Sequence, residues 1–146
     1  MKRRIAILGS TGSIGTQALE VVKQHPDKLD VEVLTAHSNA PLLIRQALEF
    51  MPNAVVISKE SMYQRVFEAL DPYDIKVYSG TDSIEQIVEM ESIDIVLVAV
   101  VGWSGLKPTL RAIGAGKPIA LANKETLVVA GELVTRLARE IGRAHV

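Results

Sequence analysis

The sequence predicts an α/β fold in which helices cover both faces of a mostly parallel sheet. Short apolar runs alternate with amphipathic segments along the whole chain. The run IDIVLVAVV at 93–101 is apolar nearly throughout, as expected for a strand that is buried on both faces. Repeated strand–helix units need crossover connections, and such connections favour parallel strands.

Apolar runs, most of them rich in Val and Ile, are predicted to be the strands. They lie at 4–8, 31–35, 54–58, 76–78, 93–101 and 118–122. After the first run, one helical face is marked by Ile14, Ala18, Val21, Val22 and His25. After the last run, a helix to about residue 142 is marked by Leu133, Val134, Leu137, Ala138 and Ile141. We place one domain at 1–142 and expect 143–146 to be a disordered or vector-derived tail.

Composition narrows the class of protein. The 146 residues are 48% hydrophobic and 23% charged, and their net charge of −1 gives no electrostatic footprint for nucleic acid. No apolar run reaches the roughly 18 residues that a membrane span needs. The chain has no cysteine, which excludes disulfides and thiolate metal sites. We expect a cytoplasmic protein with no nucleic-acid or membrane partner.

A glycine-rich loop, LGSTGSIG at 8–15, joins the first predicted strand to the first predicted helix. Its spacing, G-x-x-G-x-x-G, is a variant of the dinucleotide fingerprint of doubly wound, Rossmann-like folds. Gly9 lets the chain turn, Gly12 leaves room for a pyrophosphate, and Gly15 lets the helix pack closely. The helix N-terminus adds partial positive charge, and Thr11 and Ser13 add hydroxyl donors. A tight turn without a ligand is the alternative, but the position at the first strand–helix junction favours a nucleotide.

The end of the second predicted strand indicates which dinucleotide is bound. NAD sites usually place an Asp or Glu there, whereas this chain has His37, Ser38 and Asn39. Because no carboxylate is present to repel a 2′-phosphate, the sequence favours NADP. The alternative is an ordinary polar loop in which Asn39 caps the next helix.

Two more strand ends are candidates, since ligands of open α/β sheets bind beyond the carboxyl ends of the strands. The loop Gly102-Trp103-Ser104-Gly105 leads into a helix that begins near Leu106. We expect this loop to flank a nicotinamide, and we interpret Trp103 as a packing residue.

The other candidate end carries Asn123, Lys124 and Glu125. Asn123 can cap the following helix, and Glu125 complements its positive end. A cation at a helix N-terminus is mildly unfavourable, so we interpret Lys124 as facing an anionic or polyhydroxy ligand.

Three segments together resemble the N-terminal domain of the 1-deoxy-D-xylulose 5-phosphate reductoisomerase family. They are ILGSTGSIGTQ, VVGWSGLKPTLRAI and ALANKETLV, in this order and spacing. The resemblance extends to about residue 142. It implies an NADPH-dependent enzyme of non-mevalonate isoprenoid biosynthesis that uses Mg²⁺ or Mn²⁺. The sugar phosphate is rearranged to an aldehyde, which hydride transfer reduces to 2-C-methyl-D-erythritol 4-phosphate. Family members are typically homodimers.

Matched motif by motif, the resemblance also implies binding residues. Lys124 would bind the substrate. The cofactor, from its adenosine end and phosphates to its nicotinamide, would be held by Thr11, Gly12, Ser13, Ile14, Asn39, Asn123 and Glu125. Many members have Gly-Lys-Asn where this chain has His37-Ser38-Asn39, so the lysine of that position is absent here.

The chemical half of the family's active site has no match in this chain. Its Pro-Val-Asp-Ser-Glu-His metal-binding element, substrate phosphate site, lid and C-terminal helical domain are not found in the sequence. We therefore assign no catalytic residue and no metal ligand, and expect the chain to bind NADPH but to be inactive alone. Two alternatives remain: the Rossmann domain of another NADP oxidoreductase of the semialdehyde-dehydrogenase type, or a non-catalytic nucleotide-binding module.

Overall fold

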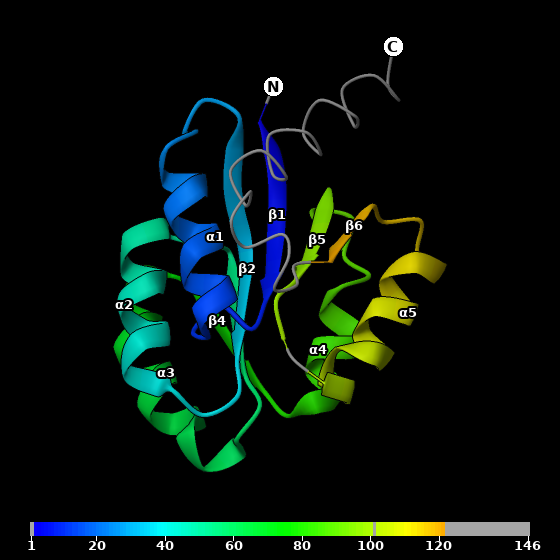
Figure 1. Ribbon diagram of the computed structural model, residues 1–146. Coiled ribbons are helices and arrows are strands. Elements are labelled where there is room, and N and C mark those ends of the chain that lie inside the picture. Colours follow the sequence, from blue (N-terminus) through cyan, green and yellow to red (C-terminus); the bar gives the residue numbers. More distant parts are fainter. Residues whose placement is uncertain (1, 101, 122–146) are drawn as a thin grey trace.

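A six-stranded parallel sheet forms the centre of the molecule (Figure 1). The computed structural model describes residues 2–100 and 102–121. The strands are β1 (Arg3–Leu8), β2 (Leu29–Ala36), β3 (Ala54–Ile57), β4 (Lys76–Ser79), β5 (Ile95–Val98) and β6 (Ile119–Leu121). Their order across the sheet is β4-β3-β2-β1-β5-β6, and each neighbouring pair is parallel. Every run predicted to be a strand overlaps one, although β1, β2 and β4 extend beyond their predicted runs.

Helices cover both faces of the sheet, which confirms the predicted doubly wound, Rossmann-like α/β fold. They are α1 (Ser13–Lys23), α2 (Ala40–Phe50), α3 (Tyr63–Leu70), α4 (Thr81–Ile87) and α5 (Leu106–Gly114), with short 3₁₀ turns η1 (Glu60–Met62), η2 (Asp71–Tyr73) and η3 (Gly102–Gly105). Figure 1 shows α1, α2 and α3 on one face and α4 and α5 on the other. The predicted helix near 133–141 lies outside the described residues.

Side chains that alternate along each strand contribute to the core on both faces of the sheet. In β1, Ile5 and Ile7 pack with α1, α2 and α3, whereas Ala6 and Leu8 pack with α4 and α5. All four side chains are at most 1% exposed. A strand buried on both faces therefore reads as a continuous apolar run, which is why these strands could be found in the sequence.

Two local expectations differ from the structure. The run 93–101 yields a strand of only four residues, Ile95–Val98, because β1 offers it partners only from Ile5 to Leu8. Ile93 and Ala99 are buried outside the strand, so the apolar run is longer than the strand itself. In α1, the buried residues are Gly15, Ala18, Leu19 and Val22; Ile14 and Val21 are only partly buried, and His25 lies beyond the helix.

The order of the strands creates a switch point between β1 and β5. From β1 the chain proceeds outward through β2, β3 and β4, and then returns to pair β5 with the other edge of β1. Open α/β sheets bind ligands at the carboxyl ends of strands at such a point. The glycine loop leaves β1 there.

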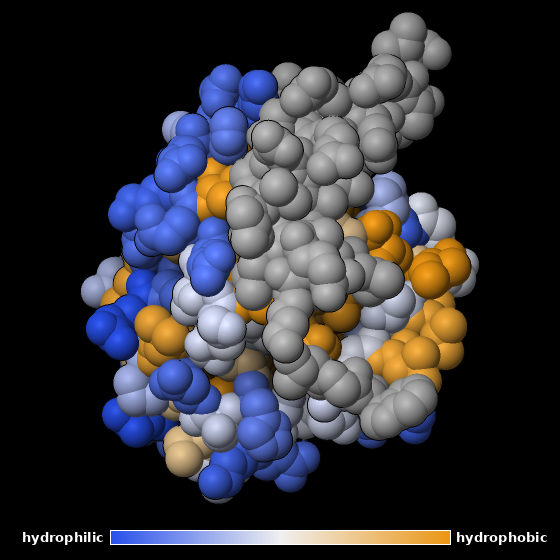
Figure 2. All heavy atoms as spheres, in the orientation of Figure 1, coloured by the Kyte–Doolittle hydropathy of each residue, from blue (hydrophilic) through white to orange (hydrophobic). Residues whose placement is uncertain are grey.

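One helix surface is notably apolar. Leu106, Leu110 and Ile113 of α5 are 46%, 57% and 56% exposed, and they contribute to the apolar surface over α5 in Figure 2. Among the helices of residues 2–100 and 102–121, none is long and apolar enough to cross a membrane.

Candidate functional site

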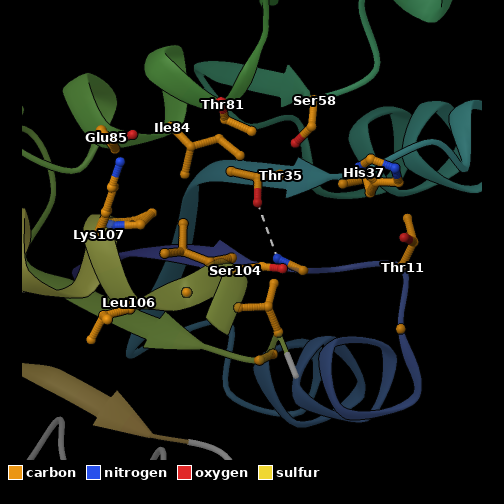
Figure 3. Close-up of a pocket in the computed structure, with 18 of the residues that line it drawn as sticks. Thr11, Thr35, His37, Ser58, Thr81, Ile84, Glu85, Ser104, Leu106 and Lys107 are labelled. Atoms are coloured by element: carbon orange, nitrogen blue, oxygen red, sulfur yellow. Dashed lines mark hydrogen bonds between the residues drawn. The ribbon is translucent and has the colours of Figure 1, made fainter. Parts of the chain in front are cut away.

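A cavity of about 910 Å³ opens at the carboxyl ends of the strands. Its volume lies within the range of small-molecule sites. It is lined by the loop after β1, by the ends of β2, β3 and β5, and by the N-terminal parts of α4 and α5 (Figure 3). Of the residues predicted to bind the cofactor, Thr11, Gly12, Ser13 and Ile14 all line it. The structure therefore brings these predicted residues together at the switch point.

Gly9 turns the chain sharply off β1, as expected. Its φ of +84° is a conformation that favours glycine. A Cβ at this position would lie 2.6 Å from Cγ1 of Val100, so the turn also packs tightly against the chain after β5. The Gly9 N–H donates to the carbonyl oxygen and to Oγ1 of Thr35, each at 3.1 Å, and Figure 3 marks the bond to Oγ1.

Gly12 and Gly15 have different surroundings although they lie three residues apart. A Cβ on Gly15 would lie 2.1 Å from the carbonyl oxygen of Gly9, so α1 packs directly on the loop. A Cβ on Gly12 would meet only that same oxygen, at 3.9 Å. Packing within the described chain therefore requires glycine at Gly15 but not at Gly12. The bare backbone of Gly12 faces the cavity instead.

The N-terminus of α1 is suited to an anion. Gly12 is its N-cap and provides no side-chain cap, and the first turn contains no acidic residue. The first N–H groups of a helix have no partner within the helix and carry partial positive charge. Thr11 is half-buried, and Ser13 is exposed. The loop and helix together can thus bind a phosphate or pyrophosphate.

A buried hydrogen-bond pair holds the loop from behind. The Ser10 hydroxyl donates to Oε1 of Gln46 at 2.8 Å, and Nε2 of Gln46 donates to the Ser10 carbonyl at 2.9 Å. Ser10 and Gln46 are 0% and 6% exposed. The Ser10 N–H also donates to the Thr35 carbonyl at 2.8 Å. Both α2 and β2 therefore fix the loop, and these contacts of Gln46 and Thr35 were not predicted from the sequence.

The polar residues at the end of β2 have two different roles. His37 lines the cavity, as the sequence allowed. Asn39 is the N-cap of α2, and its Oδ1 accepts a hydrogen bond from the Leu42 N–H at 3.2 Å. The capping role that was considered for Asn39 is therefore real, and its contact with the adenosine end of a cofactor stays a prediction. Within the cavity lining, no carboxylate comes from the end of β2.

The opposite wall of the cavity was foreseen only in part, because the sequence indicated the loop before α5 but not α4. It consists of residues from α4 and from the start of α5, and Figure 3 shows Ile84, Glu85, Leu106 and Lys107 on that side. Ile84 and Pro108 give it an apolar surface on which a flat ring can pack, while Glu85 and Lys107 place charge at its rim. No short sequence pattern marks the α4 part of this wall, because α4 reaches it only through the crossover from β4 to β5.

The remaining predicted binding residues lie outside the described residues. They are Asn123, Lys124 and Glu125. The side chain of Trp103 is likewise not described, but Ser104 in the same turn lines the cavity, and α5 begins at Leu106 as expected. In the described part of the chain, no three His, Asp or Glu side chains gather in a way that could hold a metal ion.

Comparison with known proteins agrees with this geometry. The family model of 1-deoxy-D-xylulose 5-phosphate reductoisomerase matches residues 5–131. The reductoisomerase of Phocaeicola vulgatus is 59% identical over 140 residues, which are 96% of this chain and 37% of that protein. That of Bacteroides fragilis is 60% identical over 139 residues, which are 95% of this chain and 36% of that protein. This chain thus spans little more than a third of the length of these relatives.

Solved structures lead to the same family. The Zymomonas mobilis reductoisomerase in complex with NADPH superposes with a TM-score of 0.79 at 37% identity, covering 97% of this chain and 37% of the other. A second reductoisomerase structure, in complex with NADPH, fosmidomycin and magnesium, gives a TM-score of 0.78 at 39% identity, covering 96% and 35%. The matched residues include the whole glycine loop and both walls of the cavity. This chain belongs to the 1-deoxy-D-xylulose 5-phosphate reductoisomerase family.

Proposed function

We propose that this chain is the NADPH-binding part of a 1-deoxy-D-xylulose 5-phosphate reductoisomerase. The whole enzyme would rearrange this sugar phosphate and reduce the product to 2-C-methyl-D-erythritol 4-phosphate, with Mg²⁺ or Mn²⁺ as its metal. The family match, together with a relative's structure in complex with NADPH, supports the cofactor. This chain spans only part of the length of its relatives. The sugar phosphate and the metal are therefore proposed from the family match and not from residues of this chain.

The contrast between Gly12 and Gly15 is the observation that carries the proposal. Gly15 is required by packing, because a Cβ there would strike the loop. Gly12 has no such packing requirement and borders a cavity of about 910 Å³ at the N-terminus of a helix. A glycine without a packing role at this position is explained by close approach of a ligand to the backbone.

The chain's own residues would bind and orient the cofactor. N–H groups of Gly12, Ser13 and Ile14 would hold the pyrophosphate at the start of α1. The adenosine half would lie beside His37, with Ile84 and Pro108 as apolar surface across the cavity. When bound, NADPH would supply the hydride that reduces the aldehyde.

Other residues would complete the active site of the whole enzyme, some of them in this chain beyond the described residues. In our proposal Asn123 and Glu125 contact the cofactor near its nicotinamide, and Lys124 binds the substrate. We also propose that the 146-residue chain does not turn over the sugar phosphate, since no metal-binding acids are assigned to it. Robust oxidation of NADPH by the chain with substrate and Mn²⁺ would refute this. A homodimeric enzyme in the cytoplasm stays part of the proposal.

Calorimetric titration of the chain with NADPH tests the cofactor assignment. We expect saturable binding that Gly12→Val abolishes, since the side chain would occupy the place of the pyrophosphate. Gly114→Val is the matched control: a Cβ there has no atom within 4 Å, and Gly114 lies at the far end of α5. Equal affinity of the Gly12→Val variant and the unmodified chain would show that the loop is only a turn.

The titration also separates the rival classes. A non-catalytic module that does not use nicotinamide cofactors would bind neither NADPH nor NADH. The semialdehyde-dehydrogenase alternative receives no support, because the family match and the relatives described above all name the reductoisomerase.

A further inference from the structure

We infer that Lys59, together with His37 and Ser58, forms the site for the ribose 2′-phosphate of NADPH. This inference rests on the proposed function, since it concerns the adenosine end of the same cofactor. It assigns the recognition of NADPH over NADH to the end of β3, a segment that the sequence did not single out. In this chain, a lysine from the neighbouring strand would thus supply the charge that is missing at the end of β2.

Backbone hydrogen bonds place Lys59 beside His37. β2 and β3 pair in parallel up to Ala36 and Ile57. The pairing continues beyond both strands, because the Ser58 N–H donates to the Ala36 carbonyl at 2.9 Å and the Lys59 N–H donates to the His37 carbonyl at 2.8 Å. The two chain segments therefore leave the sheet side by side, and the position of Lys59 relative to His37 is fixed by the main chain.

This pair of strand ends borders the cavity. His37 and Ser58 both line it (Figure 3). Lys59 directly follows Ser58 and is exposed. The four-carbon stem of a lysine lets its ammonium group reach a ligand held beside the neighbouring strand.

The charge of Lys59 is available for a ligand. None of the ion pairs of the described residues includes it. The adjacent carboxylate, Glu60, is in no ion pair with Lys59 among the described residues; its Oε1 lies at the start of α4, 3.3 Å from where a Cβ on Gly80 would be.

Negative charge in the cavity lining favours a cation beside the phosphate. Glu85 of α4 lies 3.8 Å from Arg111, and Lys107 lines the same wall. Asp82 also lines the cavity and is in none of the ion pairs of the described residues, so its charge would oppose a phosphate monoester, which carries about −1.5 to −2 at neutral pH. The hydroxyl of Ser58 and the imidazole of His37 can donate hydrogen bonds but supply no fixed charge. Lys59 is the basic residue that follows the cavity wall on this side, and its charge would offset that repulsion.

The test uses ligands that differ by the 2′-phosphate alone. Adenosine 2′,5′-bisphosphate is compared with adenosine 5′-monophosphate, and NADPH with NADH, in calorimetric titrations of the 146-residue chain. We expect Lys59→Gln to weaken binding of the 2′-phosphorylated member of each pair about tenfold, the effect of losing one charged hydrogen bond. Binding of the other member should be unchanged, and Lys59→Arg should retain most of the preference.

Lys76→Gln is the matched control, because it removes the same charge from an exposed lysine at the opposite end of the sheet, where β4 begins. It should leave all four affinities unchanged. If the unmodified chain prefers the 2′-phosphorylated ligands and Lys59→Gln does not reduce that preference, the inference is wrong while the proposed function stands. Equal weakening of both members of a pair also overturns it. If the unmodified chain binds none of the four ligands, the proposed function fails as well.

Discussion

Gly15 lies directly against the backbone of Gly9. A Cβ on Gly15 would be 2.1 Å from the Gly9 carbonyl oxygen and 2.6 Å from the Cα of Ser10. The first turn of α1 therefore rests on the loop that it follows, with no side chain between them. This contact sets the distance between the helix N-terminus and the cavity, so the same glycine that serves packing also positions the anion-binding N–H groups.

Gly15→Ala should destabilise the domain. In the interior of a helix, alanine is normally more favourable than glycine by about 1 kcal/mol, but here the added methyl group would overlap main-chain atoms that belong to a fixed loop. We expect the free energy of unfolding to fall by about 2 kcal/mol, a typical cost of overpacking. Urea unfolding followed by circular dichroism measures it. Gly114→Ala, whose Cβ meets no atom within 4 Å, should not lower stability, and equal effects of the two variants would contradict the packing argument.

Gln46→Leu should also loosen the loop. The substitution keeps a similar volume but removes the donor to the Ser10 carbonyl and the nearer acceptor of the Ser10 hydroxyl, which has the Thr35 carbonyl at 3.3 Å as its other acceptor. Leaving buried polar groups without partners costs about 1–3 kcal/mol, and we expect a loss of that size in the free energy of unfolding. Ser10→Ala should cost less in the Gln46→Leu background than in the unmodified chain, where it also leaves Oε1 of Gln46 without its donor.

Gln17→Leu is the control for this prediction. Gln17 is an exposed residue of α1, and surface substitutions usually change stability by no more than about 0.5 kcal/mol. Strictly additive effects of Gln46→Leu and Ser10→Ala would show that the two side chains do not act as a pair.

The sequence predicted the strands and the glycine loop because their signals are local. A strand buried on both faces is an apolar run whatever its neighbours are, and a turn such as that of Gly9 needs glycine for its own backbone. The contacts of Ser10 with Gln46 bridge residues far apart in the chain, and nothing near Gln46 in the sequence marks it as buried. A polar residue in the apolar segment LLIRQALEF of α2 was the available signal, but Arg45 beside it is exposed, so the pattern alone does not distinguish the two.

The α4 part of the far wall was missed for a topological reason. Thr81 and Glu85 belong to α4, which follows the edge strand β4, yet they line a cavity at the centre of the sheet. The return crossover from β4 to β5 carries α4 back across the other face, and the sequence indicates neither the strand order nor the point of return. The residues matched to the family were those of its motifs, and α4 contains no such motif.

Asn39 can be tested for two roles separately. Aspartate is as good an N-cap as asparagine, whereas alanine at an N-cap costs about 1 kcal/mol. Asn39→Asp should therefore leave the free energy of unfolding unchanged, and Asn39→Ala should lower it by about that amount. If Asn39 also contacts the adenosine end of the cofactor, Asn39→Asp will weaken NADPH binding despite its intact cap. Unchanged affinity in this variant would leave Asn39 with a capping role alone.

His37→Asp should shift the preference from NADPH towards NADH. His37 lines the cavity at the end of β2, where a carboxylate typically accepts hydrogen bonds from the ribose hydroxyls of NAD. The same carboxylate would repel a 2′-phosphate, and like charges brought together at a binding site cost enough that we expect NADPH affinity to fall at least about tenfold. NADH affinity should rise or stay constant. Gln24→Glu, which adds a negative charge just beyond the opposite end of α1, should alter neither affinity. A parallel loss of NADPH and NADH binding in His37→Asp would mean that His37 supports the shape of the site and does not select the cofactor.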